Sequence, residues 1–260
     1  MEHAPSIAAA ATLVLVFALE RLAPWKREWK EGWRRNVPLA VFNLVVVTLL
    51  CGGCLLALSL AAGEHGLGLF RWLGVPLPIA ALLSVPALDL VSWGWHRANH
   101  RLPLLWRFHA VHHSDSRFDV TTSLRFHAGE LLLSLPVRAA AIVALGVPVA
   151  GLVAFEIVFA VFNQLEHGNL RLSAGLERAI TGVVITPAVH RVHHSRDVRE
   201  LARNFGTIFA VWDRLFATWL PAASSRDVRV GLDGVAAPRL RDMLVLPFRR
   251  TAAPPAEAAG

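Results

Sequence analysis

The sequence predicts an all-α fold: a polytopic membrane helical bundle with a helical cap on its cytoplasmic side, in which most of the histidines are gathered. Three observations support this prediction. The 260 residues are 55% hydrophobic, and the mean hydropathy of +0.48 is too high for an ordinary soluble domain. The apolar residues form long runs of the length that membrane helices require. Ten of the twelve histidines fall between His96 and His194.

The first three apolar runs are each predicted to form one membrane helix. They cover Pro5 to Leu22, Asn36 to Ala62 and Leu77 to Trp95. The second is longer than the roughly 20 residues that a span needs. The third begins in "LGVPLP" and places Trp93 near its far end, where interfacial aromatic residues are expected.

The fourth apolar run, Glu130 to Gly168, is predicted to form a helical hairpin, which either spans the bilayer fully or only dips into it. Gly146 and Pro148 interrupt it in "LGVPVAG", and both residue types break helices. Arg138 and Glu156 also lie in this run, and charged side chains are costly in lipid. We therefore expect these two side chains to face protein or water.

The distribution of basic residues predicts the orientation in the membrane. The loop from Glu20 to Asn36 carries six basic residues, whereas the loop from Gly63 to Trp72 carries only Arg71. By the positive-inside rule the first loop is cytoplasmic and the N-terminus is exterior. The third helix then returns to the cytoplasmic side, and the hairpin must enter and leave on that side if the histidine clusters are to meet.

These elements divide the chain into three predicted regions. Residues 1–76 form N-terminal transmembrane helices and loops, and residues 77–220 hold the histidine boxes, the third span and the hairpin. Residues 221–260 form a C-terminal cytoplasmic tail whose end, "TAAPPAEAAG", is expected to be disordered. The net charge of +7 does not indicate nucleic acid, because the arginines are scattered between apolar runs. Cys51 and Cys54 are interpreted as two small apolar residues of a span.

Eight histidines form three clusters with helical spacing. The clusters are His96 and His100; His109, His112 and His113; and His190, His193 and His194. Residues three or four positions apart share a helical face, whereas adjacent residues diverge by about 100°. Two neighbouring imidazoles therefore need not bind the same ion, and the pattern suits a binuclear site.

Two further histidines lie between the clusters, His127 in "RFHAGE" and His167 in "LEHGN". A lone histidine is usually structural, but ordered clusters indicate metal binding. Ten candidate donors exceed the four of a structural zinc site and match two ions of higher coordination number. Imidazole suits zinc, iron, copper and nickel, and the absence of HExxH in the sequence leaves a zincin-type protease unsupported.

Two irons held by neutral imidazoles would be strongly electrophilic, which fits oxidative attack on an unactivated C–H bond. Nearby carboxylates would then orient the imidazole N–H groups. The main candidates are Asp89, Glu130 and Glu166. Asp115, Asp119 and Asp197 are further candidates, and for each the alternative is a solvated surface charge.

The series "HRANH", "HAVHH", "RFHAGE", "EHGN" and "HRVHH", followed by "RNFG" and "WDRLFATW", resembles the fatty acid hydroxylase and sterol desaturase superfamily. The resemblance covers roughly Leu77 to Leu220. It implies an integral membrane, non-haem di-iron enzyme that uses O₂ to hydroxylate or desaturate a lipid. By this resemblance all ten histidines between His96 and His194 are metal ligands. Ala128 stands where a proline is common, which leaves His127 intact.

The resemblance also implies partners. The chain has no HPGG haem-binding motif, so electrons are expected from a separate donor such as cytochrome b5 or ferredoxin. Fatty acyl, sterol, carotenoid and ether-lipid substrates stay open, as do hydroxylation, desaturation and ether cleavage. Outside this class, the alternatives are a zinc-dependent non-redox membrane protein and a degenerate member kept for structure. The complete set of histidine boxes argues against the second alternative.

Overall fold

The computed structural model describes residues 3–27, 32–222 and 228–249. Within these ranges the regular structure is helical, and β pairing is limited to three isolated bridges. The predicted all-α class is therefore confirmed. The predicted disorder of the last ten residues falls outside the described residues.

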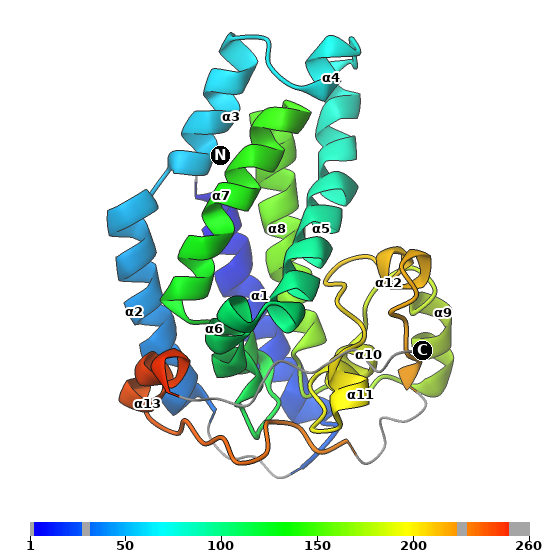
Figure 1. The fold of residues 1–260 in the computed structure, drawn as a ribbon. Coiled ribbons are helices and arrows are strands. Elements are labelled where there is room, and N and C mark those ends of the chain that lie inside the picture. The colour runs from blue at the N-terminus through cyan, green and yellow to red at the C-terminus, as the bar shows by residue number, and fades with distance from the viewer. Residues whose placement is uncertain (1–2, 28–31, 223–227, 250–260) are drawn as a thin grey trace.

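Seven helices build the bundle. They are α1 (Ala4–Leu22), α2 (Trp33–Cys51), α3 (Cys54–Glu64), α4 (Leu69–Trp72), α5 (Leu77–Arg101), α7 (Ala128–Leu145) and α8 (Val149–Glu166). In Figure 1, α3, α5, α7 and α8 run side by side. Five segments are long and apolar enough to cross a membrane: 4–22, 33–72, 77–101, 128–145 and 149–166. These agree with the predicted spans, and the predicted hairpin provides two of them.

The second span is bent, which the hydropathy of the sequence does not reveal. α2 ends at Cys51 and α3 begins at Cys54, with Gly52 and Gly53 between them. Gly53 has a φ of 76°, a left-handed conformation that glycine adopts without steric cost and that ends a helix. The Gly-Gly pair therefore separates two helices in what the sequence presents as one apolar run.

The predicted hairpin runs the length of the bundle. α7 ends at Gly146, whose φ is 69°, and Pro148 caps the start of α8. A Cβ atom at Gly68, just before α4, would overlap the backbone of Gly146. The tip of the hairpin therefore lies against the turn between α3 and α5, at the end of the bundle opposite the histidines.

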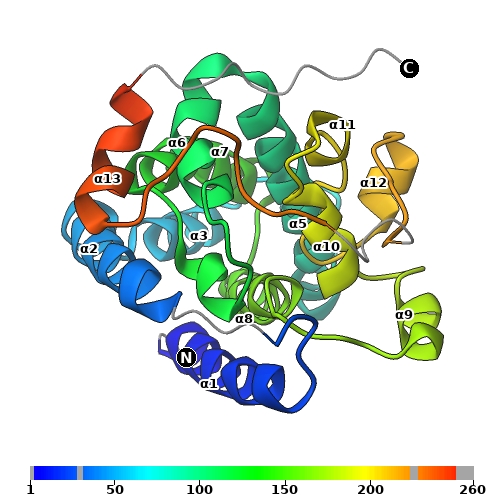
Figure 2. The ribbon, with the colours of Figure 1, turned by 90° about the horizontal axis from the view of Figure 1, so that it is seen from below.

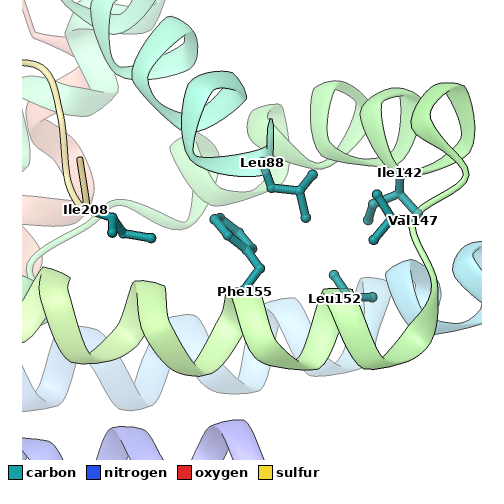
Figure 3. Close-up of a cluster of buried hydrophobic side chains, with 6 residues drawn as sticks. All are labelled: Leu88, Ile142, Val147, Leu152, Phe155 and Ile208. Carbon is teal, nitrogen blue, oxygen red and sulfur yellow. The ribbon is translucent and has the colours of Figure 1, made fainter. Parts of the chain in front are cut away.

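Apolar packing joins α5, α7 and α8. Figure 3 shows the buried cluster, which consists of Leu88, Ile142, Val147, Leu152, Phe155 and Ile208. By contrast, many large apolar side chains of the bundle point outward; Leu49 is 80% exposed and Leu82 is 72% exposed. An apolar exterior around close interhelical packing is what a bilayer requires.

Short helices form a cap over one end of the bundle. They are α6 (Pro103–His113), η1 (Val120–Leu124), α9 (Ala174–Ile180), α10 (Pro187–His193), α11 (Val198–Leu201), α12 (Val211–Leu215), α13 (Leu240–Val245) and η3 (Leu246–Phe248). Seen from below, they surround the ends of α5, α7 and α8 (Figure 2). Met243 of α13 packs with Leu39 and Val111, so the described part of the C-terminal region belongs to the cap.

Candidate metal centre

Four elements bring nine histidines together beneath the bundle. The last turns of α5 and α6, the end of α8 and the helix α10 each contribute. The first group is His96, His100, His109, His113 and His193. The second group is His112, His167, His190 and His194. In each group one ligand atom from every residue lies within 4.8 Å of the others, close enough to hold one metal ion.

Adjacent histidines are divided between the two groups. His112 belongs to the second group and His113 to the first, while His193 belongs to the first and His194 to the second. This division follows from the roughly 100° between neighbours on a helix. Consequently each of the two HxxHH boxes supplies both groups, and neither group is complete without residues from distant parts of the chain.

The spacing of the imidazole nitrogens fits metal ions. Four Nε2–Nε2 distances are short: His109–His113 3.1 Å, His112–His167 3.1 Å, His167–His190 3.0 Å and His190–His194 3.2 Å. Two nitrogens bound to one ion at about 2.1 Å lie roughly 3.0 Å apart at a right angle and roughly 3.4 Å apart at a tetrahedral angle. The Nε2 atoms therefore lie at the distances expected of nitrogens that bind one metal ion.

Hydrogen bonds at Nδ1 select the tautomer that leaves Nε2 free. Three imidazoles donate from Nδ1 to backbone carbonyls: His96 to Phe205 at 2.9 Å, His167 to Asn163 at 2.6 Å and His193 to Arg203 at 2.7 Å. A carbonyl oxygen can only accept, so the proton is on Nδ1 and the lone pair is on Nε2. The Nε2 atoms of His96 and His193 are buried and have no hydrogen-bond partner among the described residues. These unpaired nitrogens are what a bound metal would satisfy.

Two of the three predicted carboxylates contact histidines. Glu130 accepts a hydrogen bond from Nδ1 of His109 at 2.8 Å and another from Asn99 at 3.0 Å. Glu166 places Oε2 3.5 Å from Nδ1 of His190. Both carboxylates are buried. They stand where a partner would orient a metal-binding imidazole.

Asp89 is not brought to a histidine. Its carboxylate instead accepts from the backbone N–H groups of Ile208 and Phe209, at 3.2 and 3.1 Å, and from the indole of Trp212 at 2.8 Å. Asp89 lies two turns of α5 before His96, next to the loop that precedes α12. It therefore anchors that loop to the bundle.

The other acidic candidates have partners other than histidine. Asp115 accepts from Asn36 at 3.0 Å, while Asp119 and Asp197 accept backbone N–H groups at the starts of η1 and α11. None of these three carboxylates has a described contact with a histidine of either group.

His127 is also outside both groups. It caps the start of α7, where Nδ1 accepts from the backbone N–H of Gly129 at 2.9 Å. Its Nε2 lies 3.3 Å from the carbonyl oxygen of Leu244. The structure thus brings together nine of the ten predicted histidines and gives the tenth a capping position.

Asp213 is a supporting residue that the sequence did not single out. It accepts hydrogen bonds from the indole of Trp93 at 3.0 Å and from the backbone N–H groups of Phe205 and Gly206, both at 2.8 Å. The loop held in this way presents the carbonyl of Phe205 to His96. "RNFG" and "WDRLFATW" are visible in the sequence, but nothing in their spacing predicts that they meet.

Burial lowers the pKa of six imidazoles in the metal centre. It lowers the pKa of His167 to about 4 and that of His193 to about 3. It also lowers, well below the ordinary value, the pKa of His112, His113, His190 and His194, and neighbouring imidazoles act in the same direction. Because a metal ion binds the neutral imidazole, this environment prepares the donors at neutral pH.

A cavity leads from the histidines into the bundle. It contains about 920 Å³ of empty space, its open mouth included, and lies between α5, α7 and α8. Members of both groups border it, among them His96, His109, His112, His167 and His190. Its walls are largely apolar, with Trp95, Phe155 and Phe159, but Arg138 and Glu156 also line it.

Comparisons with known proteins identify relatives of this chain. The sequence model of a family described as fatty acid hydroxylase matches residues 81–218. The ornithine lipid hydroxylase OlsE of Rhizobium tropici is 28% identical over 267 aligned positions, which cover 92% of this chain and 74% of the relative. No solved structure matches.

Alkylglycerol monooxygenases form a second set of relatives. The protein from Danio rerio is 31% identical over 140 positions, covering 54% of this chain and 30% of the relative. The protein from Homo sapiens is 23% identical over 233 positions, covering 84% of this chain and 49% of the relative. This chain therefore spans half or less of these monooxygenases.

Proposed function

This chain belongs to the fatty acid hydroxylase family, and we propose that it is an integral membrane oxygenase that hydroxylates a lipid with O₂ at two iron ions. One observation carries the proposal. Two adjoining groups of buried histidines border a cavity that runs between membrane-spanning helices. This arrangement unites a dimetal ligand set with a compartment that a lipid chain can enter.

The protein's own part in the reaction is binding, orientation and exclusion of water. Bound iron would activate O₂, the oxidant that attack on an unactivated C–H bond requires. The backbone carbonyls of Asn163, Arg203 and Phe205 hold three imidazoles in the tautomer that leaves Nε2 available. Glu130 does the same for His109. The apolar walls of the cavity would hold the lipid chain and keep water from the reacting carbon.

The two sets of relatives described above favour oxygen insertion over desaturation, because their names describe a hydroxylase and monooxygenases. Cleavage of an ether lipid is the second candidate, supported by the 31% identity to the alkylglycerol monooxygenase of Danio rerio. Both reactions need two electrons from a separate donor, such as cytochrome b5 or ferredoxin. A zinc-dependent, non-redox activity is the remaining alternative, because four imidazoles such as those of the second group also suit zinc.

Comparative lipidomics tests the proposed reaction. Membranes from cells that express the chain should contain a lipid heavier by one oxygen atom than its precursor. Cells that express His100→Ala should lack this product, because His100 belongs to the first group. Product formation in the absence of O₂, or by His100→Ala, would contradict the proposal.

Substitution of the isolated histidines should separate ligands from bystanders. His167 lies in the second group, so His167→Ala should weaken metal binding or activity by at least the roughly 10–100-fold that even a supporting contact provides. His127→Ala should leave the metal content unchanged, because the ring has other partners. Metal retained per purified chain is the measurement.

His65 provides the matched control for these variants. It is exposed at the end of α3, at the opposite end of the bundle, so His65→Ala should change neither metal content nor activity. If His65→Ala lost metal and His167→Ala kept it, the assignment of His167 as a metal ligand would be contradicted.

We further propose that the cap lies on the cytoplasmic side. Arg71 is the one arginine or lysine among residues 65–76 and 146–148, at the opposite end of the bundle, whereas the cap is rich in arginine. The positive-inside rule then places the cap in the cytoplasm.

Cysteine labelling in intact spheroplasts tests this orientation. In a background with Cys51→Ala and Cys54→Ala, an impermeant thiol reagent should label Glu64→Cys. It should label Arg199→Cys only after the membrane is opened. Both positions are exposed in the structure, so burial does not confound the result. Labelling of Arg199→Cys in intact spheroplasts would contradict the orientation.

A further inference from the structure

An ion pair crosses the cavity between the two limbs of the hairpin. Arg138 of α7 donates from Nη2 to Oε1 of Glu156 on α8. Both residues line the cavity that the histidines border. Their side chains are 34% and 31% exposed, so the pair faces open space and is not sealed within packed protein.

The pair lies deep within the membrane-spanning part of the bundle. At a rise of 1.5 Å per residue, Arg138 is about 12 Å along α7 from Glu130, and Glu156 is about 15 Å along α8 from Glu166. These distances place the pair near the middle of both spans. Ionisable residues at such depth are costly, and they commonly mark a substrate pathway.

Holding α7 to α8 does not require these charges. The Gly146 turn and the cluster containing Ile142, Leu152 and Phe155 already join the two helices. Well-packed apolar side chains are often as stabilising as a buried ion pair. The position of the ion pair on the cavity wall therefore favours a role in contacting a bound ligand.

We propose that Arg138 and Glu156 together bind a neutral hydrogen-bonding group of the lipid substrate, an amide or a hydroxyl. This inference rests on the proposed function and specifies its substrate class. Among the described residues, the guanidinium uses one of its five N–H donors on Glu156, so other donors can reach a ligand oxygen. The carboxylate can in turn accept from a ligand N–H or O–H.

A neutral group suits the pair better than a charged one. The two side chains already neutralise each other, so a charged ligand group would leave one charge uncompensated in an apolar cavity. An amide or a hydroxyl offers both an acceptor and a donor and keeps the ion pair intact.

The separation of the pair from Glu130 and Glu166, the two carboxylates beside His109 and His190, adds a constraint on length. About 12–15 Å corresponds to roughly ten to twelve chain atoms, at about 1.2 Å per bond of an extended chain. The substrate is therefore a lipid whose oxidised carbon lies about that many atoms from its amide or hydroxyl group.

Ligand binding to the purified full chain in detergent tests this inference. The probes are an N-methyl fatty amide and an n-alkane of the same length, and the readout is the dissociation constant from thermal-shift titration. The wild type should bind the amide more tightly than the alkane. Arg138→Leu/Glu156→Leu should weaken amide binding about tenfold or more and leave alkane binding unchanged, because hydrogen bonds to charged groups are lost.

A charge-swapped variant, Arg138→Glu/Glu156→Arg, distinguishes recognition of the ligand from structural support of α7 and α8. It keeps an ion pair between α7 and α8 but exchanges the positions of donor and acceptor. Amide affinity that stays below that of the wild type in a folded swap variant supports recognition. The inference would be overturned if either double variant preferred the amide to the alkane as strongly as the wild type does. Formation of an oxygenated lipid by the wild type, measured separately, shows whether the proposed function itself stands.

Discussion

His113→Ala and His194→Ala should each abolish turnover, and each should lower the metal content well below two ions per chain. The two rings stack with their centroids 4.3 Å apart, yet His113 belongs to the first group and His194 to the second. Each substitution therefore removes a donor from a different ion. The loss should exceed the roughly 10–100-fold that is typical when only a supporting contact of a metal ligand is removed.

Metal per chain, determined by elemental analysis of protein reconstituted with iron, is the measurement for this pair. His113→Ala should keep the four-histidine second group, and His194→Ala should keep the five-histidine first group, so each should retain about one ion. His65→Ala is the control. A full complement of metal and full activity in either variant would refute the shared site.

Arg125→Ala should lower the free energy of unfolding by several kcal/mol, because it leaves four buried acceptors without a donor and each unsatisfied buried polar group costs about 1–3 kcal/mol. Arg125 is fully buried, and its guanidinium donates to four acceptors within 2.9 Å. They are the carbonyls of Val111 and Ala237, the side-chain oxygen of Asn36 and the hydroxyl of Ser114. The side chain thus ties α2, α6 and the C-terminal segment together beside the histidines.

Thermal unfolding in detergent measures this effect. Arg125→Lys should recover only part of the stability, because an ammonium group cannot reproduce the planar set of donors. Arg196→Ala is a matched control: Arg196 pairs with Asp233 at the surface, where ion pairs contribute about 0–1 kcal/mol. Equal melting temperatures for Arg125→Ala and the wild type would show that this network is not needed.

Features that depend on local periodicity could be predicted from the sequence. The apolar runs identify the first three spans, and the Gly146 and Pro148 break identifies the hairpin, whose two helices are also long enough to cross a membrane. Helical spacing within "HAVHH" and "HRVHH" predicts that adjacent histidines diverge, and the structure places them in different groups.

Features that depend on long-range contacts could not be predicted. The position of Asp89 on the same helix predicts that it supports His96, but its carboxylate is taken by backbone N–H groups of Ile208 and Phe209, from far along the chain. His127 has the same residue type as the clustered histidines, yet its place at the start of α7 directs it to Gly129. Asp213 supports His96 only through a folded loop, which leaves no pattern in the sequence.

Isotope labelling tests the central claim most directly. Iron-loaded protein in vesicles of a total lipid extract, supplied with a reduced ferredoxin or cytochrome b5, is exposed to ¹⁸O₂, and the lipids are analysed by mass spectrometry. The account predicts a hydroxylated lipid that carries one ¹⁸O atom, with zinc-loaded protein giving none. A product whose oxygen comes from water, or equal product from the zinc-loaded protein, would contradict it.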